Sequence, residues 1–97
     1  MITHIVFLNV KPELNKEEIL DVLNKKLLYL NQCIDELEHL EFGFNFNASP
    51  AAYDAALFST FTSKENLEAY QVHPEHIKVK DYISEVTSAR AVVDYES

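Results

Sequence analysis

The first strand is the feature that most constrains what this chain can fold into. Residues 2–10 form an apolar run rich in β-branched side chains, and Lys11-Pro12 closes it. Successive side chains of a strand point to opposite faces of its sheet. Both faces of this strand are apolar, with His4, Val6, Leu8 and Val10 on one and Ile5 and Phe7 on the other. A sheet built on such a strand must be covered on both sides.

The next segment predicts a long amphipathic helix. Asn15 is a suitable N-cap, and Glu18, three residues later, completes a capping box. Apolar side chains then recur every three or four residues, which is the spacing of one helical face. These side chains are Ile19, Leu23, Leu27, Leu30, Ile34 and Leu37. We expect the helix to extend from about residue 16 to about residue 36.

The rest of the chain predicts three strands and two shorter helices. The strands are expected over residues 38–47, 53–61 and 86–95, with a turn at residues 47–50. Thr62, followed by Glu65, opens the second helix, and His73 ends it because the residue before a proline avoids helical torsion angles. Pro74 suits the first turn of a new helix that reaches about Ile83.

This order of elements predicts a single α+β domain over residues 1–97. The order β-α-β-β-α(α)-β is the split βαβ pattern of ferredoxin-like folds, with a four-stranded antiparallel sheet and helices on one face. That layout leaves the second face of the sheet open, although the first strand is apolar on both. We expect a second copy of the chain to cover it, sheet against sheet, because most soluble oligomers are symmetric homodimers.

The charge balance excludes several classes of partner. The chain has 8 Lys and Arg against 16 Asp and Glu, a net charge of −8. Nucleic acids and anionic membranes both bind basic surfaces, so we expect neither partner. The N-terminal apolar run is too short for a signal peptide or a membrane span, and a single cysteine fits a reducing compartment; both predict a cytoplasmic protein. Cys33 itself is expected to act as a small hydrophobic residue near the core.

The densest polar and aromatic cluster is the Tyr70–His76 segment, YQVHPEH. His76, Val79 and Ile83 have the i, i+3, i+7 spacing that places His76 on the inward face of its helix. A neutral imidazole in a partly apolar pocket can take a proton, and a nearby tyrosine hydroxyl can donate to a developing oxyanion. The cluster therefore suits proton abstraction next to a carbonyl. An inward histidine is more often an ordinary core residue than a catalyst, and that alternative stays open.

Other polar and aromatic residues have simpler interpretations. His73 is expected to cap the helix before Pro74, and His39, which alternates with glutamates, is expected in solvent. Arg90 lies on a strand of small and apolar side chains, where we favour an ion pair over the binding of a ligand carboxylate. His73 and Phe7 are further candidates for ligand contact.

The sequence predicts no metal site and no cofactor. The only glycine, Gly43, lies inside a predicted strand, so no phosphate-binding loop is possible. His73 and His76 have an i, i+3 spacing without a third ligand nearby, which is a weak metal signal. The aromatic face of the second strand is interpreted as core or dimer seam rather than as a cofactor site; it consists of Phe42, Phe44 and Phe46.

Four segments together resemble the stress-responsive A/B barrel family, also called dimeric α+β barrel or Dabb domains. They are HIVF at residues 4–7, the strand from Asp54 to Phe61 with its capped helix, YQVHPEH at residues 70–76, and RAVVDY at residues 90–95. The resemblance covers residues 2–96. It implies a ferredoxin-like protomer whose sheet packs against that of a partner to form a barrel. It also implies an uncharacterised stress-responsive protein with a small-molecule pocket between sheet and helices.

One plant branch of this family consists of polyketide cyclases, which catalyse an aldol condensation and retain the carboxylate. Their general base is the second histidine of the HPxH segment, which corresponds to His76. Their assisting tyrosine corresponds to Tyr70, and another pocket histidine corresponds to His4. The resemblance thus implies, as one alternative, a lyase or cyclase in which His76 is the general base and Tyr70 a hydrogen-bond donor.

Two further alternatives remain. Those cyclases carry another pocket histidine in the third strand, where this chain has Asp54-Ala55-Ala56. The difference favours a non-catalytic barrel that binds a small apolar or aromatic ligand, or that acts only as a stable protein under stress. The other alternative is a haem- or quinone-handling monooxygenase, because other dimeric α+β barrels carry out that chemistry.

Overall fold

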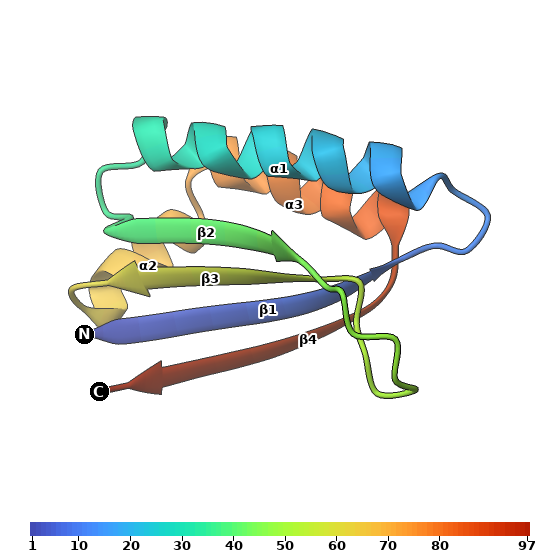
Figure 1. Cartoon of the computed structure of the whole chain (residues 1–97). Coiled ribbons are helices and arrows are strands. Elements are labelled where there is room, and N and C mark those ends of the chain that lie inside the picture. The colour runs from blue at the N-terminus through green and yellow to red at the C-terminus, as the bar shows by residue number, and fades with distance from the viewer.

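The computed structural model describes residues 1–97 as three helices packed on a four-stranded sheet (Figure 1). The strands are β1 (Ile2–Val10), β2 (His39–Phe44), β3 (Ala55–Phe61) and β4 (Thr87–Glu96). The helices are α1 (Lys16–Cys33), α2 (Lys64–Gln71) and α3 (Pro74–Val86). The strand order is β2-β3-β1-β4 and every neighbouring pair is antiparallel. The expected ferredoxin-like α+β fold is confirmed.

The helices lie on one side of the sheet, with α1 and α3 side by side over the strands in Figure 1. The strand register assigns each side chain to a face, because residues paired across neighbouring strands point the same way. His4 of β1 pairs with Ser59 of β3 and Asp94 of β4, and these three residues face the helices. Val92 and Val93 therefore lie on opposite faces, as the sequence predicts.

Several predicted boundaries are wrong. Helix α1 ends at Cys33 rather than near residue 36, because Ile34 has extended backbone torsion angles and only its N–H continues the helical bonding, to Leu30. Strand β2 ends at Phe44, and α3 continues to Val86 instead of Ile83. The N-cap of α2 is Ser63, not Thr62, since the Ser63 side chain accepts from the N–H of Asn66. The shifts leave the order of elements unchanged.

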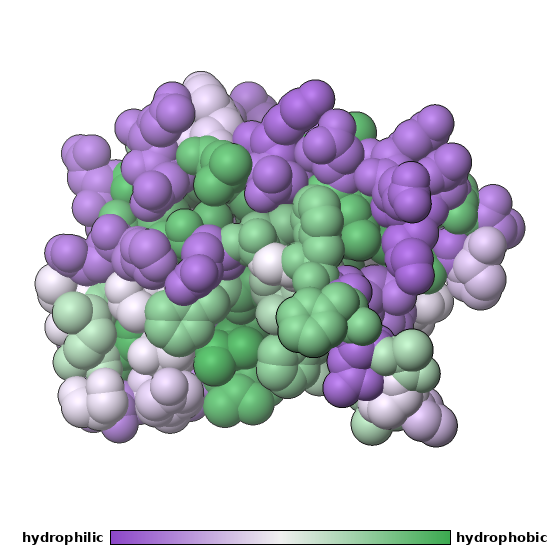
Figure 2. Space-filling model, viewed as in Figure 1, coloured by the Kyte–Doolittle hydropathy of each residue, from purple (hydrophilic) through white to green (hydrophobic).

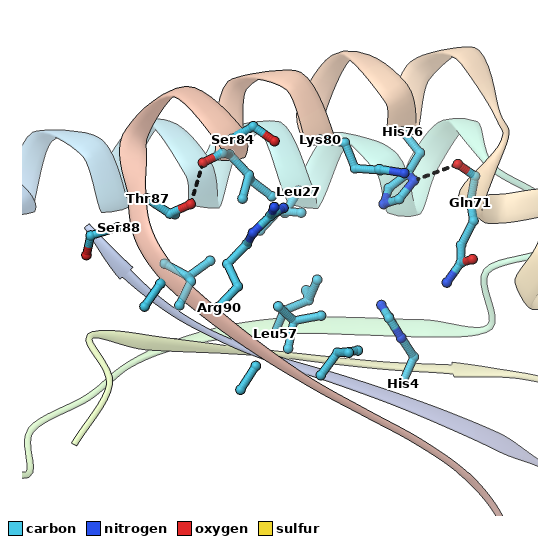
Figure 3. A pocket seen from close by; sticks show the side chains of 16 residues that line it. His4, Leu27, Leu57, Gln71, His76, Lys80, Ser84, Thr87, Ser88 and Arg90 are labelled. Carbon is cyan, nitrogen blue, oxygen red and sulfur yellow. Dashed lines mark hydrogen bonds between the residues drawn. The ribbon is translucent and has the colours of Figure 1, made fainter. Parts of the chain in front are cut away.

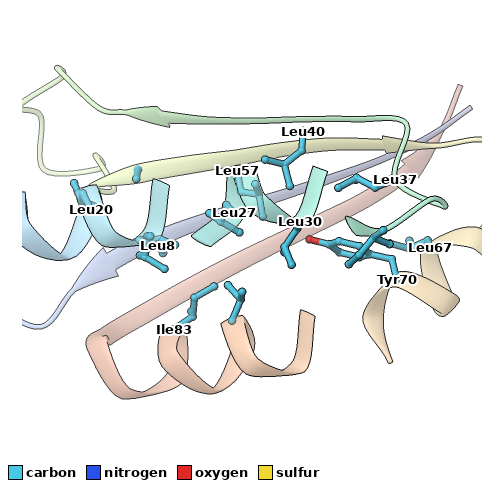
Figure 4. Packing of buried hydrophobic residues seen from close by; sticks show 14 of the residues in the cluster. Leu8, Leu20, Leu27, Leu30, Leu37, Leu40, Leu57, Leu67, Tyr70 and Ile83 are labelled. Carbon is cyan, nitrogen blue, oxygen red and sulfur yellow. The ribbon is translucent and has the colours of Figure 1, made fainter. Parts of the chain in front are cut away.

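The hydrophobic core fills the layer between sheet and helices (Figure 4). Leu23, Leu27 and Leu30 supply the inner face of α1 and are at most 1% exposed. Ile34 and Leu37 are buried as well, although they lie after the end of the helix. The apolar spacing thus correctly predicted that both residues are buried, but not that the helix ends before them. Cys33 packs against the core as expected.

The outer face of the sheet carries apolar side chains that no element of this chain covers. The face includes Ile5, Phe7, Phe58, Val93 and Tyr95, by their positions in the strand register. Phe7 is 40% exposed, Val93 54% and Tyr95 47%. Figure 2 shows hydrophobic surface gathered over the strands, beside the hydrophilic exposed side of α1. The two-sided apolar character of the first strand is therefore retained in the fold.

The aromatic residues of β2 do not form this outer face. Phe42 pairs with Leu57, faces the helices and packs against the core, as expected for a core residue. Phe44 is half exposed, and Phe46 lies fully exposed in the loop after the strand. None of the three helices combines the length and hydropathy that a membrane crossing requires.

Candidate functional site

A cavity of about 620 Å³ opens between α3, β4 and the helix-facing side of β1 (Figure 3). Polar side chains from four elements reach its wall, whereas its remaining lining is largely aliphatic. The polar ones are His4, Gln71, His76, Lys80, Ser84, Thr87, Ser88 and Arg90. A cavity of this size suits a small organic molecule.

The start of α3 holds His76 in place. Pro74 occupies the first helical turn, and the His73 ring nitrogen Nδ1 accepts from the N–H of Glu75 at 3.1 Å. His73 is thus the helix cap that the sequence predicts, and it does not line the cavity. Its contribution is to fix the position from which His76, one turn into the helix, points inward.

His76 has the geometry of a neutral base. Its side chain is only 7% exposed, and its Nδ1 donates to the carbonyl oxygen of Gln71 at 3.3 Å. Because the carbonyl can only accept, this bond assigns the proton to Nδ1 and leaves a lone pair on Nε2. Burial lowers the pKa of His76 below the usual 6.5, and the charges of Lys80, His4 and His73 act in the same direction, while the Gln71 carbonyl opposes them.

Tyr70 supports the imidazole of His76 from the side of the core. The two rings lie 4.1 Å apart, and the Tyr70 ring is 5.0 Å from that of Phe61. Tyr70 is fully buried, and burial raises the pKa of its hydroxyl. That hydroxyl has no hydrogen-bond partner and points toward Leu30 in Figure 4. Tyr70 does not line the cavity. The structure therefore does not place its hydroxyl where it could donate a hydrogen bond to a substrate bound there.

His4 lies on the cavity wall opposite α3 (Figure 3). Its Nδ1 is bonded to the carboxylate of Asp94, its partner in the β1–β4 register. A carboxylate on one ring nitrogen fixes the orientation of an imidazole and directs the other nitrogen away from it. His4 was predicted from the sequence and Asp94 was missed, because only the strand register brings residues 4 and 94 together.

The ion pair predicted for Arg90 is not present. Arg90 forms no ion pair with any acidic residue and instead points into the cavity, where Figure 3 shows its guanidinium between the sheet and α3. Its neighbours explain the difference: it lies opposite Leu8 in the register, with Val92 next on the same face. Lys80, one turn after His76 on α3, was missed entirely. Its i, i+4 spacing from His76 could have identified it, because residues four apart lie on the same face of a helix.

Phe7 lies on the outer face of the sheet and does not line this cavity. Its ring packs 5.9 Å from that of Tyr53, at the edge of a second, shallower cavity of about 500 Å³ formed with the loop before β3. The structure therefore brings His4 and His76 to one cavity, while Phe7 is on the other side of the sheet. His39 is exposed beside Glu41, as expected.

The site combines a buried neutral imidazole, a carboxylate-oriented imidazole and two cationic side chains around one cavity. The imidazole can accept a proton, and the cations can stabilise negative charge that develops on an oxygen. A family model described as the stress responsive A/B barrel domain matches residues 2–97. The chain belongs to the stress-responsive A/B barrel family.

Relatives within and around this family agree with the fold. A stress-response A/B barrel domain-containing protein of Arabidopsis thaliana is 30% identical over an alignment of 82 positions, which covers 81% of this chain. The chain spans only 30% of the length of that protein.

Solved structures extend the comparison. A protein of unknown function from Bacteroides fragilis, described as dimeric with a ferredoxin-like fold, superposes with a TM-score of 0.89 at 26% identity, over 99% of this chain and 95% of that one. Hydroxynitrile lyase from Passiflora edulis superposes with a TM-score of 0.87 at 19% identity, over 97% of this chain and 90% of that one. The identity of the second is so low that it indicates a shared fold alone.

Proposed function

We propose that this A/B barrel protein is a small-molecule enzyme of the lyase or cyclase type that abstracts a proton next to a carbonyl group. One observation carries the proposal: His76 is a buried, neutral imidazole at the wall of a 620 Å³ cavity, with its proton on Nδ1. A base that is neutral at physiological pH and shielded from water is what this reaction requires.

The proposed step uses four groups of the chain: the His76 imidazole, the Gln71 carbonyl, and the charged side chains of Lys80 and Arg90. Nε2 of His76 takes the proton from the carbon next to the carbonyl, and the electron pair of that C–H bond moves into the carbonyl to form an enolate. The Gln71 carbonyl, which accepts from Nδ1–H, stabilises the imidazolium that results. Lys80 and Arg90 supply positive charge for the enolate oxygen. The proton then returns from Nε2 to the product.

His4 and Tyr70 have supporting roles in this proposal. His4, oriented by Asp94, is a polar group on the opposite wall that can hold the substrate. Tyr70 positions the imidazole through ring packing at 4.1 Å and excludes water from that side. His73 contributes by fixing the first turn of α3.

The proposal includes a homodimer formed through the outer face of the sheet. That face presents exposed apolar side chains of β1 and β4 to solvent. A contiguous apolar surface on a small protein favours association with a partner. A ferredoxin-like neighbour at 26% identity is described as dimeric. A second copy of the same apolar sheet is the simplest complementary cover, because a two-fold interface uses one surface twice.

Deuterium exchange tests the proposed reaction directly. Phenylacetone is incubated with the protein in D2O, and loss of its benzylic proton signal is followed by ¹H NMR. We expect His76→Gln to lower the protein-catalysed rate by about 100-fold or more, the contribution typical of a general base. His39→Gln, the same change at an exposed histidine of β2, should leave the rate unchanged. Equal rates for wild type and His76→Gln would contradict the proposal.

A binding protein without catalysis is the second candidate. The helix-facing positions of β3 beside the cavity are Leu57 and Ser59, so this strand brings no ionisable group to the wall. A protein that binds phenylacetone and shows no exchange above buffer would favour this candidate over the enzyme.

A further inference from the structure

The main cavity is positive in a chain that is strongly negative. The protein has 16 acidic residues and a net charge of −8, yet no aspartate or glutamate lines this cavity. Its ionisable residues are all bases: His4, His76, Lys80 and Arg90. A local reversal of charge of this kind concentrates anions at the site while the rest of the surface repels them.

Lys80 and Arg90 have no partner within the protein. Three other lysines, Lys16, Lys25 and Lys78, form ion pairs with nearby carboxylates. Neither Lys80 nor Arg90 has a carboxylate oxygen within 4.0 Å. Asp94, on the same face of β4 as Arg90, is paired with His4 instead. Both charges are thus available to a ligand.

We infer that Lys80 and Arg90 form an anion subsite that binds the carboxylate of an oxo-carboxylic acid with an apolar body. The part of this inference that concerns catalysis rests on the proposed function of His76. The arginine fork matches the two oxygens of a carboxylate, and the lysine adds a mobile charge. Eight of the 16 lining residues are hydrophobic, which suits the apolar remainder of such a molecule.

The surroundings favour a carboxylate over a phosphate. Phosphate sites commonly use backbone N–H groups of glycine-rich turns and of helix N-termini. Here the single glycine, Gly43, lies in β2 and away from the cavity wall. The residues of α3 that line the cavity extend from His76 to Ser84, in the last turn before the helix ends at Val86. That end of a helix bears partial negative charge, which disfavours a doubly charged group.

The subsite has the correct spacing for the reaction. His76, Lys80 and Ser84 recur every four residues and line the cavity from one face of α3 (Figure 3). Lys80 therefore follows His76 by about one helical turn, about 5.4 Å along the helix axis, on the same wall of the cavity. In a 2-oxo acid the C–H next to the ketone is separated from the carboxylate by the ketone carbon alone. Binding of the carboxylate by Lys80 and Arg90 would thus keep that C–H, and the enolate oxygen formed from it, in the part of the cavity that His76 also lines.

Two matched compounds test the subsite by isothermal titration calorimetry. Phenylpyruvate and phenylacetone share a benzyl ketone and differ only in a carboxylate or a methyl group. We expect the wild-type protein to bind phenylpyruvate at least tenfold more tightly, and Arg90→Gln or Lys80→Gln to remove most of that preference. Lys78→Gln makes the same charge change on the same helix, outside the cavity, and should retain the preference. Phenyl phosphate should bind no more tightly than phenylpyruvate.

The outcomes separate this inference from the proposed function. The subsite would be overturned if the wild-type protein bound the two ketones equally, or if Lys78→Gln reduced the preference for phenylpyruvate as much as Arg90→Gln or Lys80→Gln. Tighter binding of phenyl phosphate than of phenylpyruvate would overturn the assignment of the subsite to carboxylates. Deuterium exchange of phenylacetone that depends on His76, without any preference for phenylpyruvate, would reject the subsite and retain the reaction. Binding of phenylpyruvate through Arg90 without exchange would retain the subsite and reject the reaction.

Discussion

Replacement of Tyr70 by phenylalanine is expected to stabilise the protein. The Tyr70 side chain is fully buried and its hydroxyl has no hydrogen-bond partner. A buried polar group without a partner costs about 1–3 kcal/mol, and Tyr70→Phe removes that group while it retains the ring that packs on His76. We therefore predict a gain of about 1 kcal/mol in the free energy of unfolding. For a domain of this size such a gain corresponds to a rise in Tm of about 4–8 °C.

Urea denaturation followed by circular dichroism measures this effect, at one fixed protein concentration because a dimer unfolds in a concentration-dependent way. Tyr82→Phe, at a partly buried tyrosine of α3, is the matched control and should change stability by less than about 0.5 kcal/mol. The Tyr70→Phe variant should also keep its exchange activity, since the hydroxyl lies away from the cavity. A loss of about 1 kcal/mol would show that the hydroxyl is bonded. A Tyr70→Phe variant that is stable but has lost its exchange activity would instead indicate that the hydroxyl donates a hydrogen bond to the substrate.

Three further predictions concern pH, core packing and assembly. The pKa of His76 is lower in the folded protein than its usual 6.5, so the unfolded chain binds the proton first as pH falls; the stability contributed by His76 should be lost as pH falls through about 6.5, and His76→Gln should lose less stability over that range. Leu30→Ala, at a fully buried position, should cost about 2–5 kcal/mol, whereas Leu28→Ala, at a position 45% exposed on the same helix, should change urea stability little. Val93→Lys on the outer face should convert the proposed dimer to a monomer in light scattering, whereas Val72→Lys, at an apolar position that is 70% exposed at the end of α2, should not change the oligomeric state.

Much of the fold was predictable because local patterns carried it. The two apolar faces of residues 2–10 indicated a sheet with an open apolar side, and that side is present. The inward position of His76 followed from its spacing to Val79 and Ile83, and all three are buried. Boundaries were less predictable: the apolar spacing continues to Leu37, but the helix ends at Cys33, because packing buries Ile34 and Leu37 in extended and turn geometry as well.

The composition of the site was only partly predictable, because it depends on strand register. Asp94 reaches His4 from 90 residues away through the pairing of β1 with β4. The same register places Arg90 beside apolar neighbours, so no carboxylate is close enough to pair with it. The sequence does not reveal this, because the chain has many acidic residues and any of them could have been the partner. Tyr70 was correctly expected beside His76, but the direction of its hydroxyl depends on how α2 packs against the core.

The protonation state of His76 is the most direct test of the account. Long-range ¹H–¹⁵N spectra recorded across pH 4–9 give both the pKa of each imidazole and its tautomer, and the His76→Gln variant assigns the signal. We predict that His76 titrates below its usual pKa of 6.5 and carries its proton on Nδ1 when neutral. A pKa above 6.5, or a neutral form with its proton on Nε2, would contradict the role of His76 as the base.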